Sequence, residues 1–163
     1  MSGKRLLSIP AMLVIGIAFY FYHEAIYKSY KLPTTTDEME ECTLIRVVDG
    51  DTIEVERGSE NVIVRLNGID APESVHPNQE LNTPEGEAAA AYLNELMADV
   101  DTVYLEYDFE VMDSHDRALA YVWYYDDDEL IMLNLRLVED NIAEPMTVGM
   151  NSRYQYFFDK AAT

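Results

Sequence analysis

The sequence predicts a mainly β member of the α+β class: a small five-stranded Greek-key barrel with three helices, preceded by an N-terminal hydrophobic anchor helix. Two observations lead to this prediction. Short runs of alternating apolar and polar residues recur through residues 43–163 and are interleaved with longer runs that have helical periodicity. An apolar run and a polar linker come before them. The remaining length is enough for one globular domain with a modest core.

The N-terminal segment, residues 1–30, is typical of a targeting signal for export. Lys4 and Arg5 precede an apolar run of 17 residues from Leu6 to Tyr22. This run is intermediate in length between a signal-peptide core and a full membrane span, and no small-x-small cleavage site follows it. We therefore expect an uncleaved transmembrane anchor in the cell membrane, with the domain outside the cytoplasm. A cleaved signal peptide and a secreted domain are the alternative.

Residues 31–42 are expected to form an acidic linker, because they combine a proline, a threonine run and acidic residues without apolar periodicity. Cys42 is the only cysteine of the chain, so no internal disulfide is expected. The residues before it lack the small apolar character of a lipid-attachment site. The globular domain is therefore expected to span residues 43–163.

The first elements of the domain are expected to be a strand, a bend and a hairpin. Apolar residues alternate through Val47–Val55 on both sides of an Asp-Gly pair, and they alternate again through Val62–Leu66. Gly58 lies between these two stretches and is expected to form the turn of the hairpin. Asp51 is expected to begin the second strand, so its side chain should lie near the end of the third.

Three carboxylates are expected at one rim of this sheet. Asp51 begins the second strand, whereas Asp70 and Glu73 follow the third, and hairpin pairing brings these ends together. Clustered carboxylates repel one another and need a hard cation or a guanidinium group, such as that of Arg65. Taken one at a time, Asp49, Asp51 and Asp70 are equally typical of ordinary turns, because aspartate bonds its own backbone there.

The second half of the domain is expected to add further strands and all three helices. Its elements, in chain order, are a helix over 84–100, strands over 102–107 and 118–125, and helices over 130–138 and 152–161. The segment 74–83 is an expected loop over the rim, and His76 within it is expected to be solvated rather than a metal ligand. Arg117 stands at the entrance of the fifth strand, on the same face as Leu119. This position favours a role for Arg117 in a functional site.

Three motifs in this order resemble the thermonuclease family, typified by staphylococcal nuclease. They read VVDGDTIEV, VRLNGIDAPE and DSHDRALAYV, and the resemblance covers residues 43–162. It implies an OB-fold barrel, a fold that carries nucleic-acid sites on one face and its loops. It also implies a Ca²⁺-dependent endonuclease that hydrolyses DNA, with RNA as a further candidate substrate. We expect such a domain to act as a monomer.

The resemblance assigns roles to six residues of this chain. The implied calcium ligands are Asp51, Asp70 and the main-chain carbonyl of Ala71, where the family often has threonine. Because that ligand is main chain, alanine should be tolerated. The implied catalytic residues are Arg65, Glu73 and Arg117. Glu73 matches the general base that takes a proton from water, and the two arginines match groups that bind the phosphate and stabilise its developing charge.

Two features depart from the family. Ser114 and His115 stand where the family has a nucleotide-contacting Lys-Tyr pair, and from Asp37 onward 7 Lys and Arg face 30 Asp and Glu. Such negative charge repels a polyanion, although screening over ~8 Å lets a local cation and two arginines act beneath a distant negative surface. Two other classes therefore stay open: a catalytically inactive barrel that binds nucleic acid or protein, and a surface calcium module.

Overall fold

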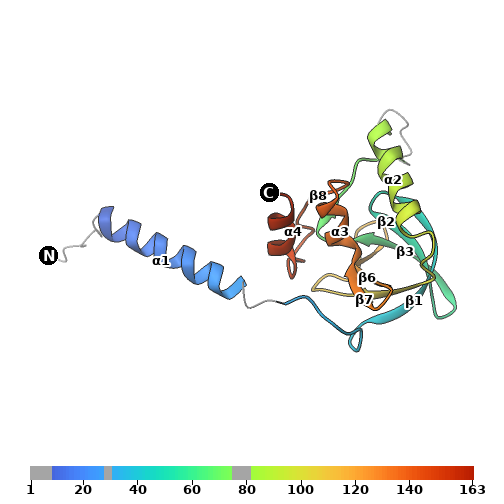
Figure 1. Cartoon of the computed structure of the whole chain (residues 1–163), viewed down its shortest axis with the longest axis horizontal. Coiled ribbons are helices and arrows are strands. Elements are labelled where there is room, and N and C mark those ends of the chain that lie inside the picture. The colour runs from blue at the N-terminus through green and yellow to red at the C-terminus, as the bar shows by residue number, and fades with distance from the viewer. Residues whose placement is uncertain (1–8, 28–30, 75–81) are drawn as a thin grey trace. The chain divides into compact units, whose positions relative to one another are not determined.

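The computed structural model describes residues 9–27, 31–74 and 82–163, and the chain divides into two compact units, residues 1–33 and 34–163. The first unit contains helix α1 (Ile9–Tyr27), drawn in blue in Figure 1. Among the described residues, no helix is both long and apolar enough to cross a membrane. This finding gives no support to the predicted membrane anchor.

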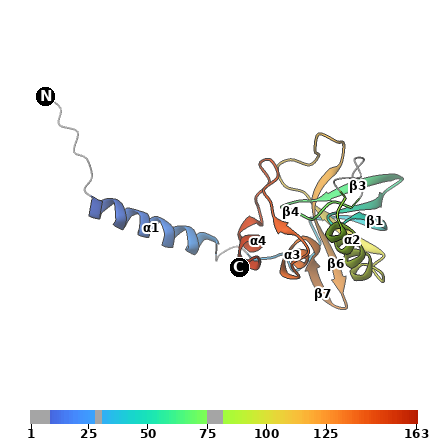
Figure 2. The same ribbon diagram turned by 90° about the horizontal axis from the view of Figure 1, so that it is seen from above.

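The second unit is built on a closed five-stranded barrel, which confirms the predicted fold class. Consecutive strands along the sheet are antiparallel, and a parallel pairing of the third strand with the sixth closes the ring. Figure 2 shows these strands curving around a common interior. In sheet order, the barrel strands are β3 (Glu60–Leu66), β2 (Thr52–Arg57), β1 (Glu40–Asp49), β5 (Thr102–Glu106) and β6 (Ala118–Asp126).

Alternation along the strands explains why these residues form a barrel. In β2, Ile53 and Val55 are fully buried, whereas Glu54 between them is partly exposed. Side chains of a strand point alternately to opposite faces, so this pattern turns one face into the interior. Strand β6 is buried on both faces over residues 118–124, because Tyr121 also packs against aromatic rings of the C-terminal segment.

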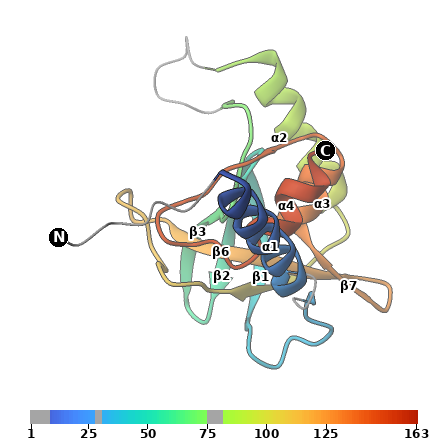
Figure 3. The same cartoon turned by 90° about the vertical axis from the view of Figure 1, so that its left-hand side faces the viewer.

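Three helices pack on the outside of the barrel, as predicted. They are α2 (Pro84–Leu96), α3 (Leu133–Glu139) and α4 (Gln155–Ala161). Helix α2 packs against β1, and α3 packs against both β6 and α4; Figure 3 shows α3 and α4 next to each other. Thr83 begins α2, since its hydroxyl accepts a hydrogen bond from the Gly86 N–H at 3.0 Å and Pro84 follows it.

The predicted helix over residues 130–138 is wrong in its first part. Glu129–Met132 form strand β7, which pairs with β6, and α3 begins only at Leu133. A tight turn joins the two strands, with Asp127 in the left-handed region at φ 51°. The apolar residues here also have helical spacing, but the hydrogen bonds of the antiparallel pairing with β6 favour a strand. Tertiary pairing often decides such short apolar segments.

Several boundaries also differ from the prediction. Strand β1 begins at Glu40, so it includes the last three residues of the expected linker, and α2 ends at Leu96 rather than near residue 100. Helix α4 begins at Gln155, three residues later than predicted, and the N–H of Ser152 donates to Asp108 Oδ2 at 3.0 Å. A two-stranded pair of β4 (Ile69–Asp70) and β8 (Glu144–Pro145) was not predicted. Strands of two residues are too short to give a periodic signal.

Gly68 joins β3 to β4 in a conformation that other residues rarely adopt. Its φ is 82°, and a Cβ there would overlap the buried ring of Phe158, whose Cδ2 would lie only 2.9 Å away. Gly58 also has a positive φ, of 65°, but nothing lies within 4 Å of a Cβ at that position. A side chain at Gly58 would therefore cause backbone strain alone, whereas one at Gly68 would cause strain and overpacking.

We predict that Gly68→Ala lowers the free energy of unfolding by about 3 kcal/mol, the sum of left-handed backbone strain and overpacking. Gly58→Ala should cost about 1 kcal/mol, because only the backbone strain applies. Urea denaturation of both variants measures the difference. Equal losses would show that contact with Phe158 is unimportant at Gly68.

Candidate active site

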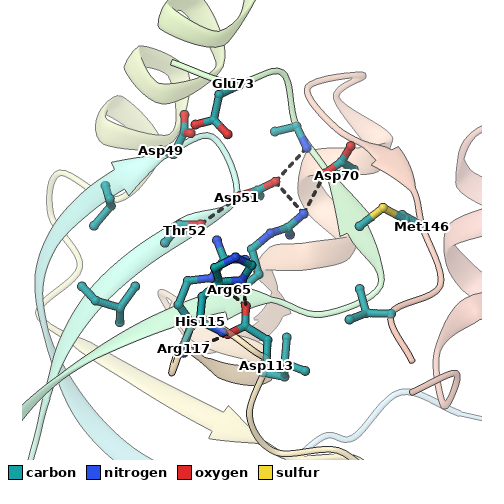
Figure 4. A pocket seen from close by; sticks show the side chains of 15 residues that line it. Asp49, Asp51, Thr52, Arg65, Asp70, Glu73, Asp113, His115, Arg117 and Met146 are labelled. Atoms are coloured by element: carbon teal, nitrogen blue, oxygen red, sulfur yellow. Dashed lines mark hydrogen bonds and ion pairs between the residues drawn. The ribbon is translucent and has the colours of Figure 1, made fainter. Parts of the chain in front are cut away.

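One cleft of about 670 Å³ opens at the end of the barrel where the β1–β2 turn, the segment after β3 and the entrance of β6 meet (Figure 4). Residues far apart in the sequence line it. All of the residues that the sequence predicted for a site lie on this cleft: Asp51, Arg65, Asp70, Ala71, Glu73 and Arg117. The three carboxylates that the hairpin argument brought together therefore line the same cleft.

Asp51 lies in the turn between β1 and β2, one residue before β2 begins, and not at the first strand position as predicted. Its Oδ2 accepts a hydrogen bond from the Ala71 N–H at 2.9 Å and lies 3.0 Å from Arg65 Nη2. Its Oδ1 accepts from the Thr52 hydroxyl at 2.9 Å, and its main-chain carbonyl accepts from the Leu66 N–H. Asp51 thus ties the turn to the segment after β3.

The guanidinium group of Arg65 forms the floor of the cleft, and its side chain is only 8% exposed. Nη1 donates to the carbonyls of Leu66 and Ile69, both at 2.8 Å. Nη2 donates to Asp70 Oδ1 at 2.8 Å and pairs with Asp51. A single nitrogen atom therefore faces both aspartates, and the two carbonyls fix the plane of the guanidinium.

Asp51 is a carboxylate whose charge is only partly compensated by the protein. Burial raises the pKa of Asp51, and the Arg65 charge, the Ala71 N–H and the Thr52 hydroxyl offset part of that increase. The net direction is upward, so the charged form is disfavoured relative to a solvated aspartate. A nearby cation lowers the pKa of such a group and stabilises its charged form. The electrostatics of Asp51 therefore favour a cation in the cleft.

Glu73 lies on another side of the cleft, with its carboxyl group next to that of Asp49 (Figure 4). Asp49 Oδ1 accepts hydrogen bonds from the Ser74 hydroxyl at 2.5 Å and the Gly50 N–H at 2.8 Å. Burial raises the pKa of Asp49, but hydrogen bonds with Glu73, Ser74 and Gly50 outweigh it and hold the pKa below its usual range. Asp49 is thus an anionic anchor for the segment that carries Glu73.

Arg117 stands at the entrance of β6 and is oriented by Asp113. Its Nε donates to Asp113 Oδ2 at 2.7 Å, while Asp113 Oδ1 accepts the N–H groups of His115 and Arg117. Burial raises the pKa of Asp113, but these hydrogen bonds and the Arg117 charge bring it below the usual range. The Arg117 side chain stays 34% exposed. It therefore has a fixed direction and remains accessible to a ligand in the cleft.

The oxygen atoms of Asp51, Asp70 and the Ala71 carbonyl are the donor types that Ca²⁺ prefers. Within the described ranges, no group of three or more His, Cys, Asp or Glu side chains could hold a metal ion. The predicted set has two such side chains and one main-chain oxygen, so it depends on water for its remaining ligands. The donor chemistry, together with the raised pKa of Asp51, fits a hard cation.

Some groups of the cleft were not predicted as parts of a site. Asp49 and Asp113 hold other site residues in place, and only the spacing of Asp113 four residues before Arg117 hinted at that role. Met146 and Val148 form an apolar part of the lining, and they belong to a segment without a periodic signal. His76 lies outside the described residues, so its predicted solvation stays a prediction.

The arginines of the domain are all engaged in ion pairs, which limits the free positive charge available to a polyanion. Each lies within 4.0 Å of a carboxylate oxygen: Arg46, Arg57, Arg65, Arg117, Arg136 and Arg153. Of these, only Arg65 and Arg117 line the cleft. Within the domain, these two arginines are therefore the ones placed to meet an anionic ligand in the cleft.

A family model and individual relatives both place this chain beside staphylococcal nucleases. Residues 63–161 match the model of a family described as staphylococcal nuclease homologue. The chain is 33% identical over 161 residues to a thermonuclease of Staphylococcus intermedius, and the alignment covers 98% of this chain and 89% of that protein. It is 31% identical over 153 residues to a thermonuclease of Staphylococcus hyicus, and the alignment covers 94% of this chain and 85% of that protein. These likenesses extend over nearly the whole chain.

Proposed function

Because this chain belongs to the family of staphylococcal nuclease homologues, we propose that its barrel domain is a Ca²⁺-dependent nuclease that hydrolyses phosphodiester bonds in DNA, with RNA as a further candidate substrate. The observation that carries the proposal is the meeting of six predicted site residues on one cleft. Their chemistry covers what the reaction needs: oxygen ligands for a cation, a carboxylate base and two guanidinium groups.

The calcium ion would be held by Asp51, Asp70 and the Ala71 carbonyl. When bound, it would supply a Lewis acid for a phosphoryl oxygen and hold water near the phosphorus atom. Asp51 is already fixed by the N–H of Ala71 and the hydroxyl of Thr52.

Glu73 is the proposed general base. It would take the proton of the attacking water, a contribution typically worth ~10² to 10⁴ in rate. The segment that carries it is tied to Asp49 through the Ser74 hydroxyl. No side-chain nucleophile is required, because water attacks phosphorus directly.

Arg65 and Arg117 are the proposed phosphate-binding groups. Guanidinium forks suit phosphate oxygens because they can donate two parallel hydrogen bonds. Arg65 contributes fixed positive charge at the floor of the cleft, whereas the more exposed Arg117 is available to the substrate at its wall. Together they would stabilise the charge that develops on the phosphoryl oxygens in the transition state.

One observation favours a second candidate, a barrel without activity that binds nucleic acid or protein. The domain carries far more acidic than basic residues, and its cleft arginines are paired with carboxylates. Against this candidate stands the complete set of site residues, since a binding module gains nothing from a cluster of carboxylates that repel its ligand.

Digestion of plasmid, single-stranded DNA and RNA by the purified chain tests the proposal. We predict cleavage in millimolar Ca²⁺ and none after chelation with EGTA, with Asp70→Asn strongly impaired and the surface variant Asp126→Asn unchanged. Binding to DNA without cleavage in Ca²⁺ would favour the inactive barrel. Equal cleavage with chelator would exclude the calcium requirement.

A further inference from the structure

The main chain at Glu73 lies directly against the first turn of α2. Gly86, the third residue of that helix, is buried, and a Cβ built on it would overlap the carbonyl carbon and oxygen of Glu73. The same Cβ would lie 2.9 Å from the carbonyl oxygen of Pro72. Only a residue without a side chain leaves room for the backbone of Glu73 at this distance.

A hydrogen bond holds the two segments at that distance. The Thr83 N–H donates to the Glu73 carbonyl oxygen at 2.9 Å, and the Thr83 hydroxyl accepts the Gly86 N–H at 3.0 Å. The residue that begins α2 is therefore bonded both to its own helix and to the main chain at Glu73. The start of the helix acts as a fixed surface against which that main chain rests.

The next residue along the chain is held from the opposite side. The Ser74 hydroxyl donates to Asp49 Oδ1 at 2.5 Å, and the Ser74 N–H contacts Asp49 Oδ2 at 3.4 Å. Asp49 itself ends β1, which packs against α2. Glu73 thus lies between two anchors, one on the helix and one on the barrel, and both are parts of rigid elements.

We propose that Gly86 is a positioning residue for the reaction: by allowing contact between α2 and the main chain of Glu73, it sets where the Glu73 carboxyl group stands in the cleft. The proposal rests on the proposed role of Glu73 as general base. An added methyl group at residue 86 must push the Glu73 carbonyl away, because both neighbours are main chain and cannot rotate aside. A misplacement of about 1 Å at a reacting group can cost about 10² in rate.

Steady-state kinetics of the full-length Gly86→Ala variant on a single-stranded oligonucleotide, in saturating Ca²⁺, tests this. We expect kcat to fall ten- to a hundredfold, with KM changed less than threefold, because the cation ligands and arginines are untouched. Its melting temperature should fall by a few degrees at most, because the better helix propensity of alanine offsets part of the cost of overpacking. Glu87→Ala, at the exposed next position of the same helix, is the matched control and should keep wild-type kcat.

A double-mutant cycle with Glu73→Gln separates positioning from a general structural effect. If Gly86 acts through the Glu73 carboxyl group, Gly86→Ala should lower kcat less than threefold in the Glu73→Gln background. Ser74→Ala, which removes one anchor without adding atoms, should show the same dependence with a smaller loss, of about threefold. This second variant keeps the test decisive if Gly86→Ala does not fold.

The outcomes distinguish this inference from the proposed function. Full activity of Glu73→Gln would overturn the proposed role of Glu73 itself. A strong loss in Glu73→Gln together with wild-type kcat in Gly86→Ala and Ser74→Ala would overturn only the positioning role. A loss in Gly86→Ala that persists in full in the Glu73→Gln background would also overturn it, because the residue would then act elsewhere.

Discussion

Replacing Glu73 with glutamine is expected to lower turnover at least a hundredfold while the fold stays intact. Glutamine has nearly the same shape but cannot take a proton from water, and general-base assistance is worth ~10² to 10⁴ in rate. The amide can also donate a hydrogen bond to the neighbouring Asp49 carboxylate, so local packing should survive. The loss should therefore appear in kcat rather than in stability.

Initial rates of oligonucleotide cleavage in saturating Ca²⁺, measured beside thermal melting, give the result. Glu85→Gln is a suitable control, because Glu85 is an exposed carboxylate in the first turn of α2 and does not line the cleft. Wild-type turnover in Glu73→Gln would mean that this carboxylate is not the base. Loss of turnover together with a much lower melting temperature would instead indicate a structural role.

Nucleotide binding is expected to depend strongly on Ca²⁺, the second large effect. Asp49, Asp51, Asp70, Glu73 and Asp113 all line the cleft, and the two arginines there are already paired with carboxylates. A phosphate group entering the cleft without a cation would meet this negative charge. A bound Ca²⁺ adds two positive charges at that point, so it should govern substrate binding as well as chemistry.

The affinity for Ca²⁺ should be modest. The proposed ligands, two aspartates, one carbonyl and several waters, would make a site with few charged groups, comparable to extracellular modules that bind at ~10⁻⁴ to 10⁻³ M. Asp51→Asn should weaken calcium binding further, because one of its two charged ligands is lost. Added salt should weaken nucleotide binding less than in basic nucleases, since few side chains neutralise phosphates.

The sequence predicted the barrel and the rim of carboxylates because both follow from local rules. Alternation in β2 and β3 fixes which residues point inward, and the turns at Gly50 and Gly58 fix which strand ends meet. The position of Asp51 near Asp70 follows from that register. Strand β7 was missed because its four residues fit helical spacing equally well, and only pairing with β6 decides between the two.

The ion pairs and anchors of the site could not be predicted in the same way. The sequence suggested Arg65 as a guanidinium that could neutralise the clustered carboxylates, but its contacts with Asp51 and Asp70 form only because the segment after β3 folds back over the β1–β2 turn. Contact between Gly86 and Glu73 likewise depends on how α2 packs on β1. Such contacts between distant segments are determined by tertiary packing, which residue patterns describe only indirectly.

Calorimetric titration of thymidine 3′,5′-bisphosphate into the protein tests the central claim most directly, with Ca²⁺ and with chelator, at two salt concentrations. The account predicts binding at least tenfold tighter with Ca²⁺, a smaller effect of salt, and loss of the calcium enhancement in Asp51→Asn. Equal affinity with and without the metal would contradict it, because the acidic cluster would then not be a cation site.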